Sequence, residues 1–139
     1  MKLKRKSFSK DVAVSRDIFI TYIGALVGFS NKCKNLHWAA PSKDIHVYLD
    51  EFYDIITKFT DTIAESFMGI LGKMQPNDII AICPEITSAT GFINQVLEKT
   101  EEFHKAIEEN EEYSGILSEC DDFIKDINKY KYLFSLTDW

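Results

Sequence analysis

The chain has 139 residues, of which 45% are hydrophobic, and a formal net charge of −6 at pH 7. A chain of this length forms one domain, and its apolar share is sufficient for a buried core. The negative charge excludes a generally basic, phosphate-binding surface. Three cysteines, Cys33, Cys83 and Cys120, occur without a CxxC motif. They predict reduced thiols and a cytoplasmic protein rather than a disulfide framework.

Positive charge is concentrated in the first ten residues. The basic side chains there are Lys2, Lys4, Arg5, Lys6 and Lys10. We expect a flexible basic arm over residues 1–10, followed by a single domain over residues 11–139. Such an arm could contact DNA, although most short basic ends only raise solubility.

A long first helix is expected next, capped by Ser9 or Asp11 and ending near Leu36, before a proline. Residues 18–29 form the most hydrophobic run of the chain. This run of about 12 residues is too short to span a bilayer. We therefore predict a buried helix rather than a membrane span or a signal segment.

Residues 45–69 predict a second, strongly amphipathic helix, capped by Ser42 or Asp44. Apolar residues recur there every three or four positions, which is typical of a helix face that packs in a core. The members of this stripe are Ile45, Leu49, Phe52, Ile56, Phe59 and Ile63.

A separate band on the same helix carries side chains of the metal-ligand type. Its members are His46, Asp50, Asp61 and Glu65. Asp50 and Asp61 are separated by about 16 Å along a helix, whereas metal–ligand bonds measure about 2 Å. One chain therefore cannot close a metal site with these four residues. An ordinary solvated helix face is the alternative interpretation.

The spacing of this band is symmetric. Positions 46 and 65, like positions 50 and 61, are centred on the same point between Ile55 and Ile56. An antiparallel two-fold packing of the helix against its own copy would bring the four positions together in pairs. The pattern predicts a metal site shared across a dimer.

The rest of the chain completes a helical bundle. Residues 73–87 form the longest irregular stretch, and we expect them to be a crossover connection. A third helix follows from Thr87 or Ser88 to Glu109, and a fourth covers residues 113–135. No strand pattern occurs, so the sequence predicts an all-α, antiparallel four-helix bundle with a long crossover between helices 2 and 3.

Three motifs in the middle of the chain carry a family resemblance. They are Lys34-Asn35-Leu36-His37-Trp38, His46-x-x-x-Asp50-Glu51-Phe52-Tyr53 and Asp61-Thr62-Ile63-Ala64-Glu65. The chain resembles the Dps branch of the ferritin-like superfamily, the mini-ferritins. The resemblance implies a ferritin-like bundle and an iron-storage protein that oxidises Fe(II) to Fe(III) with peroxide or oxygen.

The resemblance also implies which residues form the ferroxidase centre. His37, His46 and Asp50 would come from one subunit, and Asp61 and Glu65 from its two-fold mate. All five would bind iron and act in catalysis. The expected assembly is a homo-oligomer, at least a two-fold dimer, with a dodecamer as the larger form and no membrane partner.

Departures from the family pattern keep two other functions open. The connection between His37 and His46 is about three residues shorter than is usual in the family, and Ser66 replaces a common arginine. A non-catalytic ferritin-like bundle, such as a virion component, is one alternative. A DNA-condensing protein that uses the basic arm is the other. Trp38 and Tyr53 are candidates for electron donors or for interface aromatics.

Overall fold

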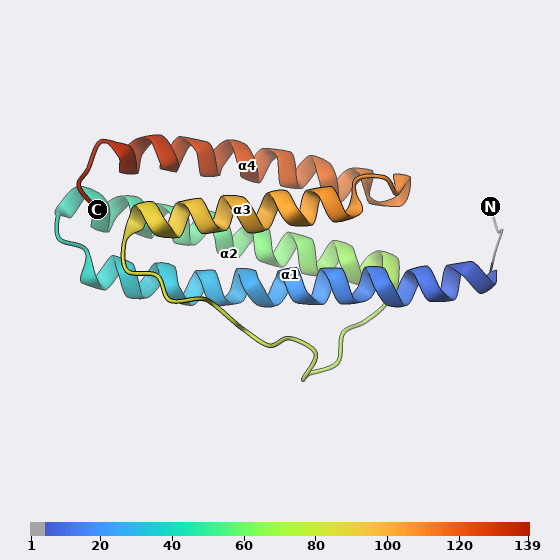
Figure 1. Cartoon of the computed structure of the whole chain (residues 1–139). Helices are drawn as coiled ribbons and strands as arrows, with labels where there is room; N and C mark the ends of the chain where they lie inside the picture. The colour runs from blue at the N-terminus through green and yellow to red at the C-terminus, as the bar shows by residue number, and fades with distance from the viewer. Residues whose placement is uncertain (1–4) are drawn as a thin grey trace.

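A computed structural model describes residues 5–139, with side chains from residue 12 onward. These residues form four α-helices: α1 (Arg5–Ala39), α2 (Lys43–Leu71), α3 (Ala89–Ile107) and α4 (Ser114–Ser135). The 3-10 turn η1 (Glu111–Tyr113) precedes α4. The helices lie side by side along a common direction (Figure 1). No strand occurs within residues 5–139. The predicted all-α class with four packed helices is confirmed.

Helix α1 begins earlier than the sequence suggested. It starts at Arg5, so the predicted caps at Ser9 and Asp11 are wrong, because no glycine or proline interrupts the helix there. Arg5, Lys6 and Lys10 of the expected arm belong to this helix, whereas Lys2 and Lys4 lie outside the described residues.

Helix α1 also contains a long apolar stretch. Its part Val12–Ala39 has the length and hydropathy of a membrane-spanning helix. Within the bundle, its side chains Phe19, Leu26 and Phe29 are buried in the common core.

Serine caps fix the starts of α2 and α3, and Ser42 was one of the two caps predicted for α2. The Ser42 hydroxyl oxygen accepts a hydrogen bond from the N–H of Ile45 at 3.3 Å. The Ser88 hydroxyl oxygen accepts one from the N–H of Gly91 at 3.0 Å. Each bond satisfies a donor that the first turn of a helix otherwise leaves unpaired.

The core lies between all four helices. All six apolar residues of the predicted α2 stripe are buried. Phe52, in the middle of this stripe, is fully buried, and its ring centroid lies 5.9 Å from that of Phe92, 6.0 Å from that of Phe123 and 5.5 Å from that of Tyr130. This one side chain therefore connects α2 to both α3 and α4.

Residues 72–88, called the crossing segment below, link α2 to α3. They return along α1 to the end of the bundle at which α2 also begins, so α2 and α3 run in the same direction (Figure 1). The Arg16 guanidinium holds the start of this segment by donating hydrogen bonds to the carbonyl oxygens of Leu71, Gly72 and Lys73 at 3.2, 3.3 and 2.8 Å. Arg16 also lies 3.6 Å from a carboxylate oxygen of Asp78.

Two glycines of α1 allow the crossing segment to lie directly on the helix. A Cβ atom at Gly24 would collide with the carbonyl oxygen of Ile80. A Cβ atom at Gly28 would lie 2.7 Å from the carbonyl oxygen of Ile82. Because both obstacles are backbone atoms, a side chain at either position would have to displace the segment.

We predict that Gly28→Ala destabilises the protein despite the better helix propensity of alanine. Overpacking against the segment should lower the free energy of unfolding by about 1–2 kcal/mol net of the helix gain. Gly69→Ala is the matched control, since nothing lies within 4 Å of a Cβ at Gly69, and it should be neutral or stabilising. Urea unfolding followed by circular dichroism measures both. Equal stabilisation by the two substitutions would contradict the close contact.

Candidate metal centre

The short turn between α1 and α2 brings two predicted ligands together. His37 lies in the last turn of α1 and His46 in the first turn of α2. Their rings stack with a centroid distance of 3.8 Å and an interplanar angle of 21°. The shorter connection therefore places His37 directly beside His46.

Each of these imidazoles is held by the backbone of the other residue. His37 Nδ1–H donates to the carbonyl oxygen of His46 at 2.7 Å, and His46 Nδ1–H donates to the carbonyl oxygen of His37 at 2.9 Å. A carbonyl oxygen can only accept, so Nδ1 carries the hydrogen in both rings. In the neutral rings, the lone pair is then on Nε2. Metal-binding histidines are commonly oriented by such a bond from the second ring nitrogen.

Asp50 lies next to this histidine pair. One of its carboxylate oxygens is 4.0 Å from His37 Nε2. The same oxygen is 3.2 Å from Lys34 Nζ, and the Lys34 ammonium lies 4.2 Å from the centroid of the Tyr53 ring. No role for Lys34 was predicted from the sequence. Lys34 precedes His37 by about one helical turn, so both side chains lie on the same face of α1. This spacing could have indicated that Lys34 also lies near Asp50.

A buried thiol close to Asp50 is not a ligand candidate. Cys33 is fully buried, and its S–H donates to the carbonyl oxygen of Leu49 at 3.2 Å. Burial raises the pKa of the Cys33 thiol to about 12, so it stays protonated at neutral pH, whereas metals bind the thiolate. The candidate ligand atoms at this position are therefore imidazole nitrogen and carboxylate oxygen.

The two remaining predicted ligands lie elsewhere on α2. Asp61 and Glu65 are exposed, and eleven residues of helix separate Asp50 from Asp61 by about 16 Å. Asp61 borders a surface hollow of about 530 Å³ between α1 and α2. Within the described part of the chain, no group of three or more His, Cys, Asp or Glu side chains is close enough to hold a metal ion.

One chain therefore supplies two separate parts of the predicted site. The first part is His37, His46 and Asp50 at one end of α2, and the second is Asp61 and Glu65 nearer the other end. Of the two aromatic candidates, Trp38 is 71% exposed, while Tyr53 is half-buried beneath Lys34. An exposed indole beside His37 is suited to contact with another chain.

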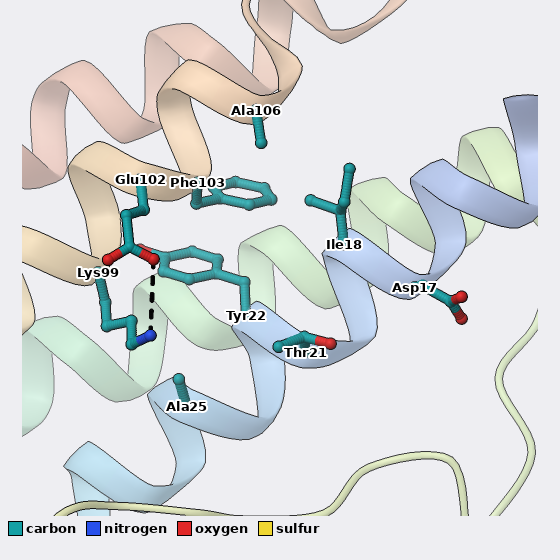
Figure 2. Close-up of a pocket in the computed structure, with 9 residues that line it drawn as sticks. All are labelled: Asp17, Ile18, Thr21, Tyr22, Ala25, Lys99, Glu102, Phe103 and Ala106. Carbon is teal, nitrogen blue, oxygen red and sulfur yellow. Dashed lines mark ion pairs between the residues drawn. The ribbon is translucent and has the colours of Figure 1, made fainter.

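A second hollow, of about 300 Å³, lies between α1 and α3 (Figure 2). The stacked rings of Tyr22 and Phe103, with centroids 4.1 Å apart, border it. At its rim the Lys99 ammonium lies 3.5 Å from a Glu102 carboxylate oxygen, so these charges neutralise each other. The lining of this hollow includes no imidazole.

Comparison with known proteins gives a family for most of the chain. Residues 37–134 match a family of unknown function, DUF5856. The matched region begins at His37 and includes all five predicted ligands as well as α2, α3 and most of α4. Comparisons with curated proteins and with solved structures give no match. The chain belongs to the family DUF5856.

Proposed function

We propose that this protein binds Fe(II) and oxidises it, with peroxide or oxygen, at a site that two copies of the chain form together. The observation that carries this proposal is the paired histidine arrangement. Both rings are fixed through Nδ1–H, which leaves the lone pair of each neutral ring on Nε2, and the Nε2 of His37 lies 4.0 Å from an Asp50 carboxylate oxygen. His37, His46 and Asp50 would contribute from one copy, and Asp61 and Glu65 from the other.

The chemistry of these side chains suits ferrous iron. Imidazole and carboxylate ligands without a thiolate favour iron over a structural zinc site. A site with few protein ligands also leaves positions for an oxidant. The five residues of this chain would bind and orient the ion, and Asp50 and Glu65 would supply the negative charge that offsets it.

The helix arrangement supports a ferritin-like bundle of the Dps type. Such a bundle needs a long connection between two parallel helices, and the crossing segment follows that path (Figure 1). Between α2 and α4 there is a hollow of about 390 Å³ whose lining includes three carboxylates, those of Glu119, Asp122 and Asp126, and one ammonium, that of Lys58. An acidic surface of this kind would attract iron ions and favour their deposition as a ferric mineral, which is the storage step we propose.

Anaerobic titration with Fe(II), followed by peroxide, tests this function. We expect the wild-type protein to bind Fe(II) and then to develop ferric absorbance rapidly. Asp50→Ala and Glu65→Ala should each abolish the fast phase, because each removes one carboxylate from every site. Absence of iron binding above background in the wild-type protein would disprove the proposal.

Lys34 favours a second candidate function, a non-catalytic bundle. Its ammonium already neutralises Asp50 at 3.2 Å. Because this ion pair already balances the negative charge of the Asp50 carboxylate, Asp50 can be stable at this position without a metal ion. In this alternative, the same helices would form a structural oligomer without iron turnover.

Lys34→Gln separates the two functions. If Asp50 is an iron ligand, removal of the competing ammonium should tighten Fe(II) binding about three- to five-fold, since an exposed ion pair contributes at most about 1 kcal/mol. Lys131→Gln makes the same change in net charge on α4 and should leave the Fe(II) dissociation constant unchanged. Isothermal titration under anaerobic conditions measures both. An equal, small effect of the two substitutions would favour the structural bundle.

A further inference from the structure

The third histidine of the chain lies at the end of the bundle opposite the turn between α1 and α2 (Figure 1). His104 is in the last turn of α3, and its side chain is 27% exposed. The ring nitrogen Nε2 lies 3.0 Å from a carboxylate oxygen of Asp121 on α4. The other ring nitrogen, Nδ1, lies 3.4 Å from a carboxylate oxygen of Glu108, four residues later in the chain. The imidazole of His104 is therefore placed between two carboxylates.

These two contacts are compatible with only one protonation state of the ring. A carboxylate oxygen only accepts a hydrogen bond, so Nε2 carries a hydrogen in its bond to Asp121. A neutral imidazole has a single N–H, and the lone pair of its Nδ1 would then face the negatively charged oxygen of Glu108. The imidazolium has an N–H on each side and attracts both carboxylates. The arrangement is thus favourable for the protonated ring and less favourable for the neutral ring.

The surroundings of His104 also favour a positive charge. The last turn of a helix carries a partial negative charge, which attracts a cation. Residues 101–122 contain nine acidic residues and a single lysine, Lys105. A cation between Asp121 and Glu108 also offsets the mutual repulsion of these two carboxylates.

The charged groups that face the ring come from α3 and α4. They are Glu108 and Asp121. Two further charges, Glu101 on α3 and Lys125 on α4, lie three or four residues from members of this group, at helical spacing. Among the residues with described side chains, neither of them forms an ion pair with His104, and no charged group of α1 or α2 does so. The response of this link to pH therefore depends on one imidazole and two carboxylates.

We infer that His104 forms a pH-sensitive link between α3 and α4. The protonated ring binds Asp121 and Glu108 together and so holds α4 against the end of α3. Loss of the proton turns the contact with Glu108 from attraction into repulsion. Because the folded chain favours the protonated ring more than the unfolded chain does, the link contributes to stability at low pH, and this contribution is lost as the pH rises. The inference is independent of iron binding.

Urea unfolding of the full chain, followed by circular dichroism, tests this link with His104→Gln as the comparison. Measurements at about pH 6 and about pH 8.5 cover most of the range in which histidine ordinarily changes its charge, above the range in which carboxylates ordinarily do so. His37 and His46 are present in both proteins, so their effects cancel. The ratio of the wild-type folding constant to that of the variant should be about two- to five-fold larger at the lower pH, as for a partly exposed ion pair. An equal ratio at the two pH values would overturn the proposal.

A second pair of variants identifies the carboxylate that makes the link sensitive to pH. Glu108→Gln removes the negative charge at Nδ1 and offers an amide N–H that a neutral ring can accept, so the pH dependence should decrease. Glu109→Gln makes the same change of charge one residue later, at an exposed position without an ion pair to His104, and should keep the wild-type pH dependence. Equal pH dependence in these two variants would also contradict the link.

Discussion

A mixture of Asp50→Ala and Glu65→Ala chains should regain about one quarter of the wild-type rate of iron oxidation, although each variant alone is inactive. Random exchange of equal amounts gives half of the dimers one chain of each kind. In such a mixed dimer, one site lacks both carboxylates and the other has neither substitution. Recovery to this level requires that Asp50 and Glu65 act together across two chains.

The ferric absorbance rise after peroxide addition measures this recovery. The two variants should be mixed by co-refolding, so that dimers form anew. A mixture of Asp50→Ala with Asp50→Ala/Glu65→Ala chains is the control, and it should remain inactive because no intact site can form. Inactivity of the first mixture, with an active wild-type protein, would show that the two carboxylates do not meet across a dimer.

Phe52→Ala should cause the largest loss of stability, about 3–5 kcal/mol. Phe52 is fully buried and contacts aromatic rings of α3 and α4. Its truncation leaves a cavity where three helices meet. Domains of this kind are stable by only about 5–15 kcal/mol, so the variant should unfold at a much lower denaturant concentration in equilibrium unfolding followed by circular dichroism.

Phe52→Leu is the matched control for this prediction. It keeps an apolar side chain at the same position and should cost clearly less than the alanine substitution, because a smaller cavity remains. A loss below about 1 kcal/mol for Phe52→Ala would show that α3 and α4 do not depend on this contact.

Sequence periodicity was sufficient to predict the helices and their buried faces. The α2 stripe from Ile45 to Ile63 is buried throughout, because helix geometry alone decides which residues share a face. Ser42 was predictable as a cap because its hydroxyl group satisfies one of the first N–H groups of a helix. The start of α1 was not predictable, since residues 5–11 contain neither a breaker nor a unique cap.

The residues of the candidate site could be chosen from the sequence, but their contacts could not. His46 and Asp50 follow from the spacing on α2, and His37 from the Dps-like motif. The reciprocal bonds between the two histidines involve backbone carbonyl groups, which leave no trace in the sequence. The ion pair of Lys34 with Asp50 depends on the register between α1 and α2, and that register is a tertiary property.

The turn at residues 40–42 has a consequence for the order of folding. A loop this short costs little entropy to close, so α1 and α2 can associate as a hairpin before the distant helices dock. His37, His46 and Asp50 all lie on this hairpin. Helix α3 can dock only after the much longer crossing segment has packed against α1. The cluster of His37, His46 and Asp50 can thus form early in folding, ahead of the completed bundle.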